Sequence, residues 1–494
     1  MAASQQSSSQ DQRDSARIIC AGGLDSTQNH LNLSANKPGA ATALVNYEVG
    51  LTGGYRRING FVPYNSTYAE VGVGVAEGPV LGIIIYELAS TGAIQIMAAR
   101  KDLGVNQYHL YLYTAGTGWV QINDGLTHIC TSGSFTVEKL RWDVSNNNAQ
   151  NVLAFVDGVN PCTLYDGTTW GYVQSTSTGA DMAHAGGAQV VDAPTFMTFF
   201  SKTLFLAGDE INDARGVVSY SAPNAFFDFT SASGGGQITS GLLVNQIKPF
   251  RDSLYIFSKH GIKKAVADTT SGFLLSDVTS NIGCIASDSV LEIGGDLVFL
   301  APDGIRPVSG TDKIGDVQLE SISKPAQLMI TTLTQSSPEL SLNGVVVRSK
   351  SQFRYFIGND TSAVPDSVGI IGGLRDTSTS YTSAGYVSNG WEFGQLQGIR
   401  ASCVTSRYVG SQELVLHGDY DGCVYQQEVG ESFNGATIVS VYSTPYLDFG
   451  EPDIRKVFDK INVFIRGEGT LVMGLKVDYD WGLLDAGPRN PQQY

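Results

Sequence analysis

The residues with the clearest chemical potential lie in the stretch NYEVGLTGGYRRINGF, residues 46–61, where Gly53 and Gly54 are followed by Arg56 and Arg57. A glycine pair permits a positive-φ turn or a close backbone approach, and consecutive arginines in a strand point to opposite faces. One guanidinium can then form an internal ion pair while the other binds a carboxylate on a neighbouring chain. We predict a subunit contact at these four residues; a solvated turn with two spectator bases is the alternative.

A second candidate is the acidic stretch HGDYDGCVYQQE, residues 417–428, which places Asp419, Asp421 and Glu428 at positions of a calcium-binding EF-hand loop. An EF-hand needs an oxygen ligand first and a helix on each side. Here His417 stands first, and strand-like runs flank the stretch. We therefore predict an Asp-Gly hairpin turn with Glu428 on a solvated face.

A third candidate is TLYDGTTWG, residues 163–171, which resembles the Asp box of sialidase propellers. Asp166 and Gly167 are adjacent where that motif has a spacer between them. The box is a structural turn remote from the catalytic residues of those enzymes. The stretch therefore favours a propeller-like hairpin rather than a glycosidase.

Sequence motifs for catalysis are missing. The chain contains no G-x-S-x-G, H-E-x-x-H or G-x-x-x-x-G-K-[ST], and GGGQ at 234–237 lacks the lysine of a phosphate-binding loop. The six histidines are far apart, and none sits at a ligand-like spacing from another. We predict no catalytic, cofactor-binding or metal-binding residue, and we expect the protein not to be an enzyme.

The composition favours a large, strand-rich and acidic protein. The 494 residues include 57 glycines and carry a net charge of −16; 42% are hydrophobic and 16% are charged. This length favours two or three domains or one large repetitive domain, and the composition favours short strands joined by tight turns. Since an acidic surface repels phosphate backbones, we expect DNA to pass this protein without being held tightly.

The cysteines and the N-terminus indicate the compartment. Six scattered cysteines with no C-x-x-C predict reduced thiols and synthesis in a reducing cytoplasm. Residues 1–17 are rich in Ser and Gln and lack the apolar core of a secretory signal. No stretch approaches the roughly 20 apolar residues of a spanning helix. We expect a flexible N-terminal arm and no membrane span.

Short apolar runs with period-two alternation follow from Ile18 onward, which is typical of all-β proteins; only fragments such as 286–294 could form brief helices. Seven segments share one form: a small polar residue, a strand, a turn at Gly or Asp-Gly, and a second strand. They recur at roughly 40 to 65 residues, the range of propeller blades. The segments are 106–122, 152–170, 201–210, 251–265, 294–310, 351–360 and 413–428.

Such hairpins cannot bury their faces alone, but stacked around an axis they cover one another and leave few exposed edges. We predict a β-propeller of about five to seven blades with an additional small β-sandwich-like domain near the termini; unrelated β-sandwich hairpins are the alternative. The expected boundaries are a flexible arm at 1–17, an N-terminal β segment at 18–100, the propeller core at 101–435, a C-terminal hairpin or sandwich at 436–482 and a tail at 483–494.

Blocks along most of residues 18–480 resemble a family of tail proteins from short-tailed bacteriophages, called the tail nozzle, tail hub or packaged-DNA stabilisation protein. The first block is NYEVGLTGGYRRINGF. The others follow in order: VVSYSAPNAFFDF (217–229), IKPFRDSLYIFSKHGIKKA (247–265), IGCIASDSVLEIGGDLVFLAPDGIRPVSG (282–310), DGCVYQQEVG (421–430) and YSTPYLDFGEPDIRKVFDKINVFIRGEG (442–469).

The resemblance implies a virion protein with a β-propeller and appended β domains. It implies a ring, typically of about six copies, at the distal end of the tail below the portal and its adaptor ring. Such a ring carries or adjoins receptor-binding fibres or spikes, retains the packaged genome and lets DNA pass through its lumen. No enzyme activity or cofactor is implied. We expect assembly in the host cytoplasm followed by residence in the virion.

Two other classes of function stay open. A secreted carbohydrate-active propeller would need two acidic side chains converging in a pocket, and an export signal would favour it. A lectin-like propeller that binds sugar or protein would be a monomer, so a purified chain that never assembles would favour that class.

Overall fold

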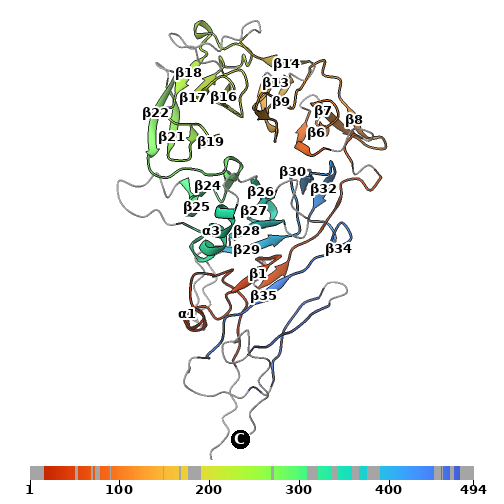
Figure 1. Ribbon diagram of the computed structural model, residues 1–494, viewed down its shortest axis with the longest axis vertical. Helices are drawn as coiled ribbons and strands as arrows, with labels where there is room; N and C mark the ends of the chain where they lie inside the picture. Colours follow the sequence, from red (N-terminus) through yellow and green to blue (C-terminus); the bar gives the residue numbers. More distant parts are fainter. Residues whose placement is uncertain are drawn as a thin grey trace, which may run out of the picture.

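The structure is a computed structural model (Figure 1). The residues that it describes are 16–49, 54–67, 70–72, 78–88, 91–147, 150–165, 169–175, 191–268, 272–308, 321–336, 342–358, 367–374, 390–449, 458, 460–467 and 472–478. Strands dominate these residues, and the α-helices among them are short: α1 spans His30–Asn36 and α3 spans Gln327–Ser336. A 3₁₀ turn, η2 (Ser287–Ser289), lies in the fragment predicted to form a brief helix. The all-β prediction is confirmed.

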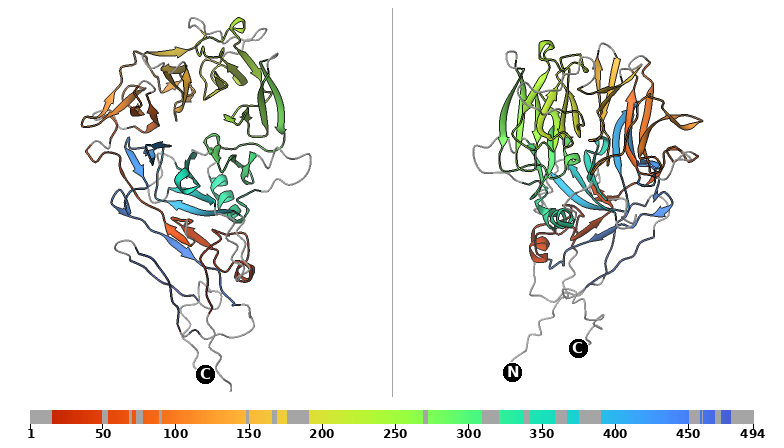
Figure 2. Two further views of the ribbon diagram at one scale, coloured as in Figure 1. Left: turned by 180° about the vertical axis from the view of Figure 1, so that it is seen from behind. Right: turned by 45° about the horizontal axis from the view of Figure 1, so that its top comes forward.

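Seven sheets of three to six strands, counted over the described residues, are arranged around an axis as the blades of a propeller (Figures 1 and 2). Blade 1 contains β5 (Val80–Glu87), β6 (Ile94–Asp102), β7 (Gln107–Thr114) and β8 (Gly118–Gln121); blade 2 contains β11 (Arg141–Asn147), β12 (Gln150–Val156), β13 (Cys162–Tyr165) and β14 (Trp170–Val173). Blade 3 contains β15 (Phe196–Phe200), β16 (Thr203–Asp209), β17 (Ala214–Tyr220) and β18 (Gly236–Thr239); blade 4 contains β19 (Gln246–Phe250), β20 (Ser253–Phe257), β21 (Ile262–Asp268) and β22 (Gly272–Thr279).

The last three blades differ in strand number. Blade 5 has β23 (Leu291–Ile293), β24 (Asp296–Ala301) and β25 (Gly304–Pro307). Blade 6 has β26 (Leu342–Val347), β27 (Gln352–Ile357), β28 (Val368–Leu374), β29 (Trp391–Gln397), β1 (Ala43–Val45) and β35 (Val441–Ser443). Blade 7 has β30 (Cys403–Val409), β31 (Gln412–Gly418), β32 (Val424–Gln427), β4 (Phe61–Pro63), β33 (Ser432–Phe433) and β34 (Ala436–Thr437). The predicted β-propeller is confirmed, and its blade count is the upper value of the predicted range.

Neighbouring blades pack through apolar faces. Leu164 of blade 2 and Leu206 of blade 3 belong to one cluster of buried side chains, and Phe205 of blade 3 shares another with Ile256 of blade 4. Alternate side chains of a strand point to opposite faces, so each blade packs against both of its neighbours. Burial of one such side chain contributes about 1.5–3 kcal/mol, which explains why the thin hairpins are stable only as a closed set.

The N-terminal segment closes the propeller. Strand β4 pairs antiparallel with β32 of blade 7, and β1 pairs in parallel with β29 of blade 6. Blade 1 begins at Val80, so the first blade starts inside the predicted segment 18–100 rather than at residue 101. The boundary differs because strands distant in sequence complete one sheet, which a reading of consecutive hairpins does not show.

The C-terminal segment divides in a similar way. Strands β34 and β35 of the predicted 436–482 unit belong to blades 7 and 6. Beyond them, residues 458, 460–467 and 472–478 are extended, have no assigned strand pairing among the described residues, and lie outside the propeller; we name them the C-terminal arm (Figure 1, blue). Residues 1–15 of the predicted arm at 1–17, and the whole of the predicted tail at 483–494, lie outside the described residues.

Candidate functional site

Three of the four predicted interface residues, Gly54, Arg56 and Arg57, belong to a small hairpin that packs against blade 6. Strand β3 (Tyr55–Arg57) pairs antiparallel with β2 (Tyr47–Val49), which sets Arg56 opposite Glu48. Arg56 is exposed, and its Nη2 lies 3.5 Å from Asn59 Oδ1. Gly54 has a φ of +77°, as the predicted turn requires.

Of the other two predicted interface residues, Arg57 is half-buried and Gly53 lies outside the described residues. The side chains of this hairpin therefore leave one guanidinium, that of Arg56, on the surface. The subunit contact at Gly53, Gly54, Arg56 and Arg57 stays a prediction.

The same hairpin supplies one member of a buried ion cluster formed by Glu48, Lys350, Arg354 and Glu428. Lys350 Nζ lies 2.7 Å from Glu48 Oε1, and Arg354 Nη2 lies 3.4 Å from Glu48 Oε2. Glu428 pairs with both Lys350 and Arg354. Burial alone would raise the pKa of Glu428, but Arg354 and Lys350 outweigh it and hold the pKa at about 2. The cluster joins β2 to blades 6 and 7, and each charge in it has an opposite charge beside it.

The EF-hand-like stretch forms the predicted hairpin turn between β31 and β32. Arg400 binds both aspartates: its Nε lies 3.0 Å from Asp419 Oδ1 and its Nη2 lies 2.6 Å from Asp421 Oδ2. Glu428 does not lie on a solvated face as predicted, because the ion cluster takes it into the interior. The acidic residues of this stretch therefore form ion pairs with arginine and lysine side chains. Asp166 and Gly167 of the Asp-box-like stretch lie outside the described residues.

A second ion cluster crosses the propeller axis. Arg141 begins the first strand of blade 2, and Asp288 lies in η2 just before blade 5. Arg141 Nη2 and Lys139 Nζ lie 2.9 Å and 3.0 Å from Asp288 Oδ2. Although burial favours the neutral acid, Arg141 and Lys139 hold the pKa of Asp288 well below its usual value. Because blades 2 and 5 are not neighbours, these side chains span the centre of the propeller at this level.

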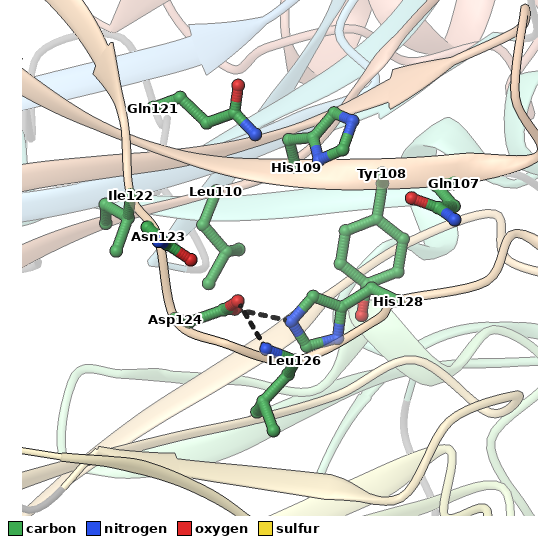
Figure 3. A pocket seen from close by; sticks show the side chains of 10 residues that line it. All are labelled: Gln107, Tyr108, His109, Leu110, Gln121, Ile122, Asn123, Asp124, Leu126 and His128. Carbon is green, nitrogen blue, oxygen red and sulfur yellow. Dashed lines mark hydrogen bonds and ion pairs between the residues drawn. The ribbon is translucent and has the colours of Figure 1, made fainter.

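A pocket with a volume of about 340 Å³ lies on blade 1 (Figure 3). Strand β7, strand β8 and the loop that follows β8 line it. At its base, His128 Nε2 lies 2.7 Å from Asp124 Oδ2, and the Leu126 amide donates to Asp124 Oδ1 over 3.0 Å. The His128 ring stacks on Tyr108 with 4.9 Å between ring centroids. The rim carries amide side chains from Gln107, Gln121 and Asn123.

The groups beneath the pocket have partners that fix their positions. The Tyr172 hydroxyl lies 3.3 Å from His128 Nδ1 and donates to the Thr127 carbonyl over 2.6 Å. The Tyr108 hydroxyl donates to Asp157 Oδ2 over 2.5 Å, and burial raises the pKa of Asp157. This arrangement can bind a small polar molecule through its rim. Sequence analysis missed the pocket; its one local signal is the four-residue spacing of the Asp124 and His128 pair.

No group of three or more His, Cys, Asp or Glu side chains among the described residues is placed to hold a metal ion. No helix within those residues is long and apolar enough to cross a membrane.

Comparisons with known proteins add a structural likeness. No protein-family model matches the chain, and no curated protein matches it. Among solved structures, the chain is similar to a crystal structure of BBS1N in complex with ARL6DN, soaked with lead. The likeness covers 75% of this chain and 97% of that chain, at 10% identity and a TM-score of 0.42. At that score the likeness carries no argument about function, and the propeller assignment rests on the sheet topology above.

Proposed function

We propose that the chain is a structural virion protein of a short phage tail, which forms a ring-shaped nozzle or hub below the portal and its adaptor. The ring continues the DNA conduit, retains packaged DNA and supports receptor-binding fibres or spikes. The order of the resembling sequence blocks, from 46–61 to 442–469, is what suggests this class of protein.

The observation that carries the proposal is the C-terminal arm. Every described residue of the arm is exposed, including Phe464 at 91% and Val472 at 94%, whereas the propeller buries most of its apolar side chains between blades. Exposed apolar groups gathered in one place on a well-packed protein mark an interaction surface. This is what a subunit of an assembly needs and what a free-standing enzyme or lectin does not.

The axial ion cluster bears on where DNA would pass. Lys139, Arg141 and Asp288 occupy the centre of the propeller at one level, so the propeller axis is not the conduit in this proposal. The lumen lies instead between copies of the chain. A net charge of −16 suits such a lumen, because like charges let DNA slide without being held.

The test is made on phage particles. The proposal expects the chain in purified virions at about six copies per particle, with antibody label at the tail tip. A nonsense codon in its reading frame should give particles that package DNA but release it prematurely. Absence of the chain from purified virions of normal infectivity contradicts the proposal.

A second candidate function is carbohydrate binding, favoured by the polar rim of the blade 1 pocket. Gln107, Gln121 and Asn123 offer the amide donors and acceptors that suit sugar hydroxyls. Asp124 is the single carboxylate among the ten lining residues, which favours binding over hydrolysis because a glycosidase needs two. A glycan array with the full chain tests it: Gln121→Ala with Asn123→Ala should abolish binding, and no binding by the wild type excludes it.

A further inference from the structure

The C-terminal arm presents apolar side chains in a strand-like pattern. In its first run Ile461, Val463 and Ile465 alternate with other residues and are 49–50% exposed; in its second run Met473, Leu475 and Val477 alternate and are 41–60% exposed. Since alternate side chains of an extended chain point to one side, these three residues of each run share a side, and the more exposed Phe464 and Val472 belong to the opposite one. Figures 1 and 2 show the two runs next to each other outside the propeller, at the end where β1 and β35 lie.

The arm contacts the residues that follow β35 at its start. The Phe458 ring packs on Phe449 with 5.4 Å between centroids, and Lys476 pairs with Asp478 within the arm. Extended backbone without a paired neighbour presents N–H and C=O groups that an open strand edge can satisfy. The arm can therefore add as a strand to an open sheet edge.

An open sheet edge of this kind exists on the same chain. Among the described residues, strand β35 ends the blade 6 sheet and is paired on one side, with β1. Val441, the first residue of β35, is 42% exposed, and Val439, two residues before it, is 67% exposed. An exposed apolar strand edge is a site for strand addition, and the arm does not occupy it in its own chain.

The charge distribution favours a second copy of this chain as the source of the arm that pairs with the β35 edge. Residues 454–482 contain five basic and four acidic side chains, a net charge of +1, so the remainder of the chain carries −17. Two copies repel each other over most of their surfaces, but not where this near-neutral segment meets an acidic body. Each copy has both an arm and an open β35 edge, so the arm of one copy can pair with the edge of the next in a head-to-tail arrangement.

We propose that the C-terminal arm of one copy adds as strands to the β35 edge of the next copy, with the side of each run that carries the three alternating apolar residues covering Val439 and Val441. The contact is heterologous, and its repetition from copy to copy closes the ring. The inference specifies how the proposed ring is held together, and it rests on the proposed function for the statement that this ring belongs to a phage tail. The partner is recognised by backbone hydrogen bonds along β35 and by apolar burial.

The experiment measures the mass of the full-length chain by analytical ultracentrifugation over a range of concentrations. The arm variant carries Val463→Lys and Leu475→Lys, and the edge variant carries Val439→Lys and Val441→Lys. The matched controls are Leu243→Lys and Leu274→Lys, whose side chains are 68% and 64% exposed outside both surfaces. Wild type and controls should assemble, whereas each variant alone should stay a monomer.

Mixing the two variants gives the sharpest result. The edge variant still has a good arm and the arm variant a good edge, so the mixture should form a 1:1 dimer of about 105 kDa, twice the 52.7 kDa chain, and stop there. A mixture that stays monomeric overturns the proposal. So does either variant assembling like wild type, since the contact would then not join arm to edge.

Hydrogen exchange on the wild type gives a readout that needs no variant. Amides of 460–467 and 472–478 should exchange slowly in the assembled chain and fast after dilution to monomer. Fast exchange at both concentrations, or slow exchange at both because the chain covers its own arm, overturns the proposal. If the arm joins copies in solution but virions lack the chain, the proposed tail function is wrong and the arm-to-edge contact stands. If virions contain rings of the chain and the arm variant still forms them, the arm-to-edge contact is wrong and the tail function stands.

Discussion

Lys350 Nζ lies 2.7 Å from Glu48 Oε1, and this contact ties blade 6 to a hairpin that precedes blade 1 in the sequence. Arg354 and Glu428 complete the cluster from β27 and from the residue that follows β32. The propeller is thus closed by buried charge as well as by strand pairing.

Removing one acid from this cluster should destabilise the whole propeller. Glu48→Gln leaves Lys350 and Arg354 short of one negative partner, and breaking a buried pair in this way costs about 3 kcal/mol. The free energy of unfolding in urea measures the loss. The control is Asp277→Asn, which removes the partner of Lys263 at a site where Asp277 is 71% exposed, and it should cost less than about 1 kcal/mol. Equal small losses in both variants contradict the assigned role of the cluster.

The axial cluster makes a second prediction about stability. Asp288→Asn leaves Lys139 and Arg141 without the carboxylate between them, so we expect a loss of about 3 kcal/mol in the free energy of unfolding. Glu292→Gln, at an exposed position of β23, is the control and should change little. A loss below about 0.5 kcal/mol for Asp288→Asn would mean that the three side chains do not hold the blades together.

His417 should make stability depend on pH. Burial lowers its pKa from 6.5 to about 3, so between those values the unfolded chain binds a proton that the folded chain does not. The contribution of His417 to the free energy of unfolding is therefore fully present above about pH 6.5. It is lost on acidification, by about 1.4 kcal/mol per pH unit for this one proton. Denaturation at pH 6.5 to 5 measures the slope before the carboxylates contribute.

The matched variants for that slope are His417→Gln and the exposed His260→Gln. His417→Gln should lower the slope of the unfolding free energy against pH by about 1.4 kcal/mol per pH unit, the contribution of one proton. It should do so even though it also alters packing against Phe61 and Tyr425. His260→Gln should leave the slope as in wild type. An unchanged slope in His417→Gln shows that another group causes the acid sensitivity.

The cysteines predict indifference to reducing agents. All six are free, and burial raises the pKa of Cys130 to about 11 and that of Cys284 to about 12. A thiol reagent should therefore react with the half-buried Cys20 and Cys423 in the native protein, although burial slows Cys423 by raising its pKa, and with all six only after unfolding. The melting temperature should be the same with and without reductant. A shift of several degrees on adding reductant contradicts this, because it requires a disulfide.

Much of the fold could be predicted because the signal is local. Each of the seven hairpin segments identified in the sequence contributes strands to a different blade, from 106–122 in blade 1 to 413–428 in blade 7. Alternation of apolar residues and the turn at Gly or Asp-Gly are properties of neighbouring residues, so they are visible without a structure.

The closure and the sites could not be predicted, because they depend on contacts between distant residues. Glu48 and Lys350 are 302 positions apart, and Arg141 and Asp288 are 147 apart. Glu428 was predicted on a solvated face because its local sequence shows only a turn, whereas its partners come from β27 and the residues just before it. The pocket likewise requires β7, β8 and the following loop to converge.

The native mass of the full-length wild-type chain decides whether copies assemble into a closed ring. We predict one sharp species at a fixed multiple of 52.7 kDa, about six copies, since heterologous contacts that close give one stoichiometry. A 52.7 kDa monomer at every concentration and salt, with no larger species, contradicts it.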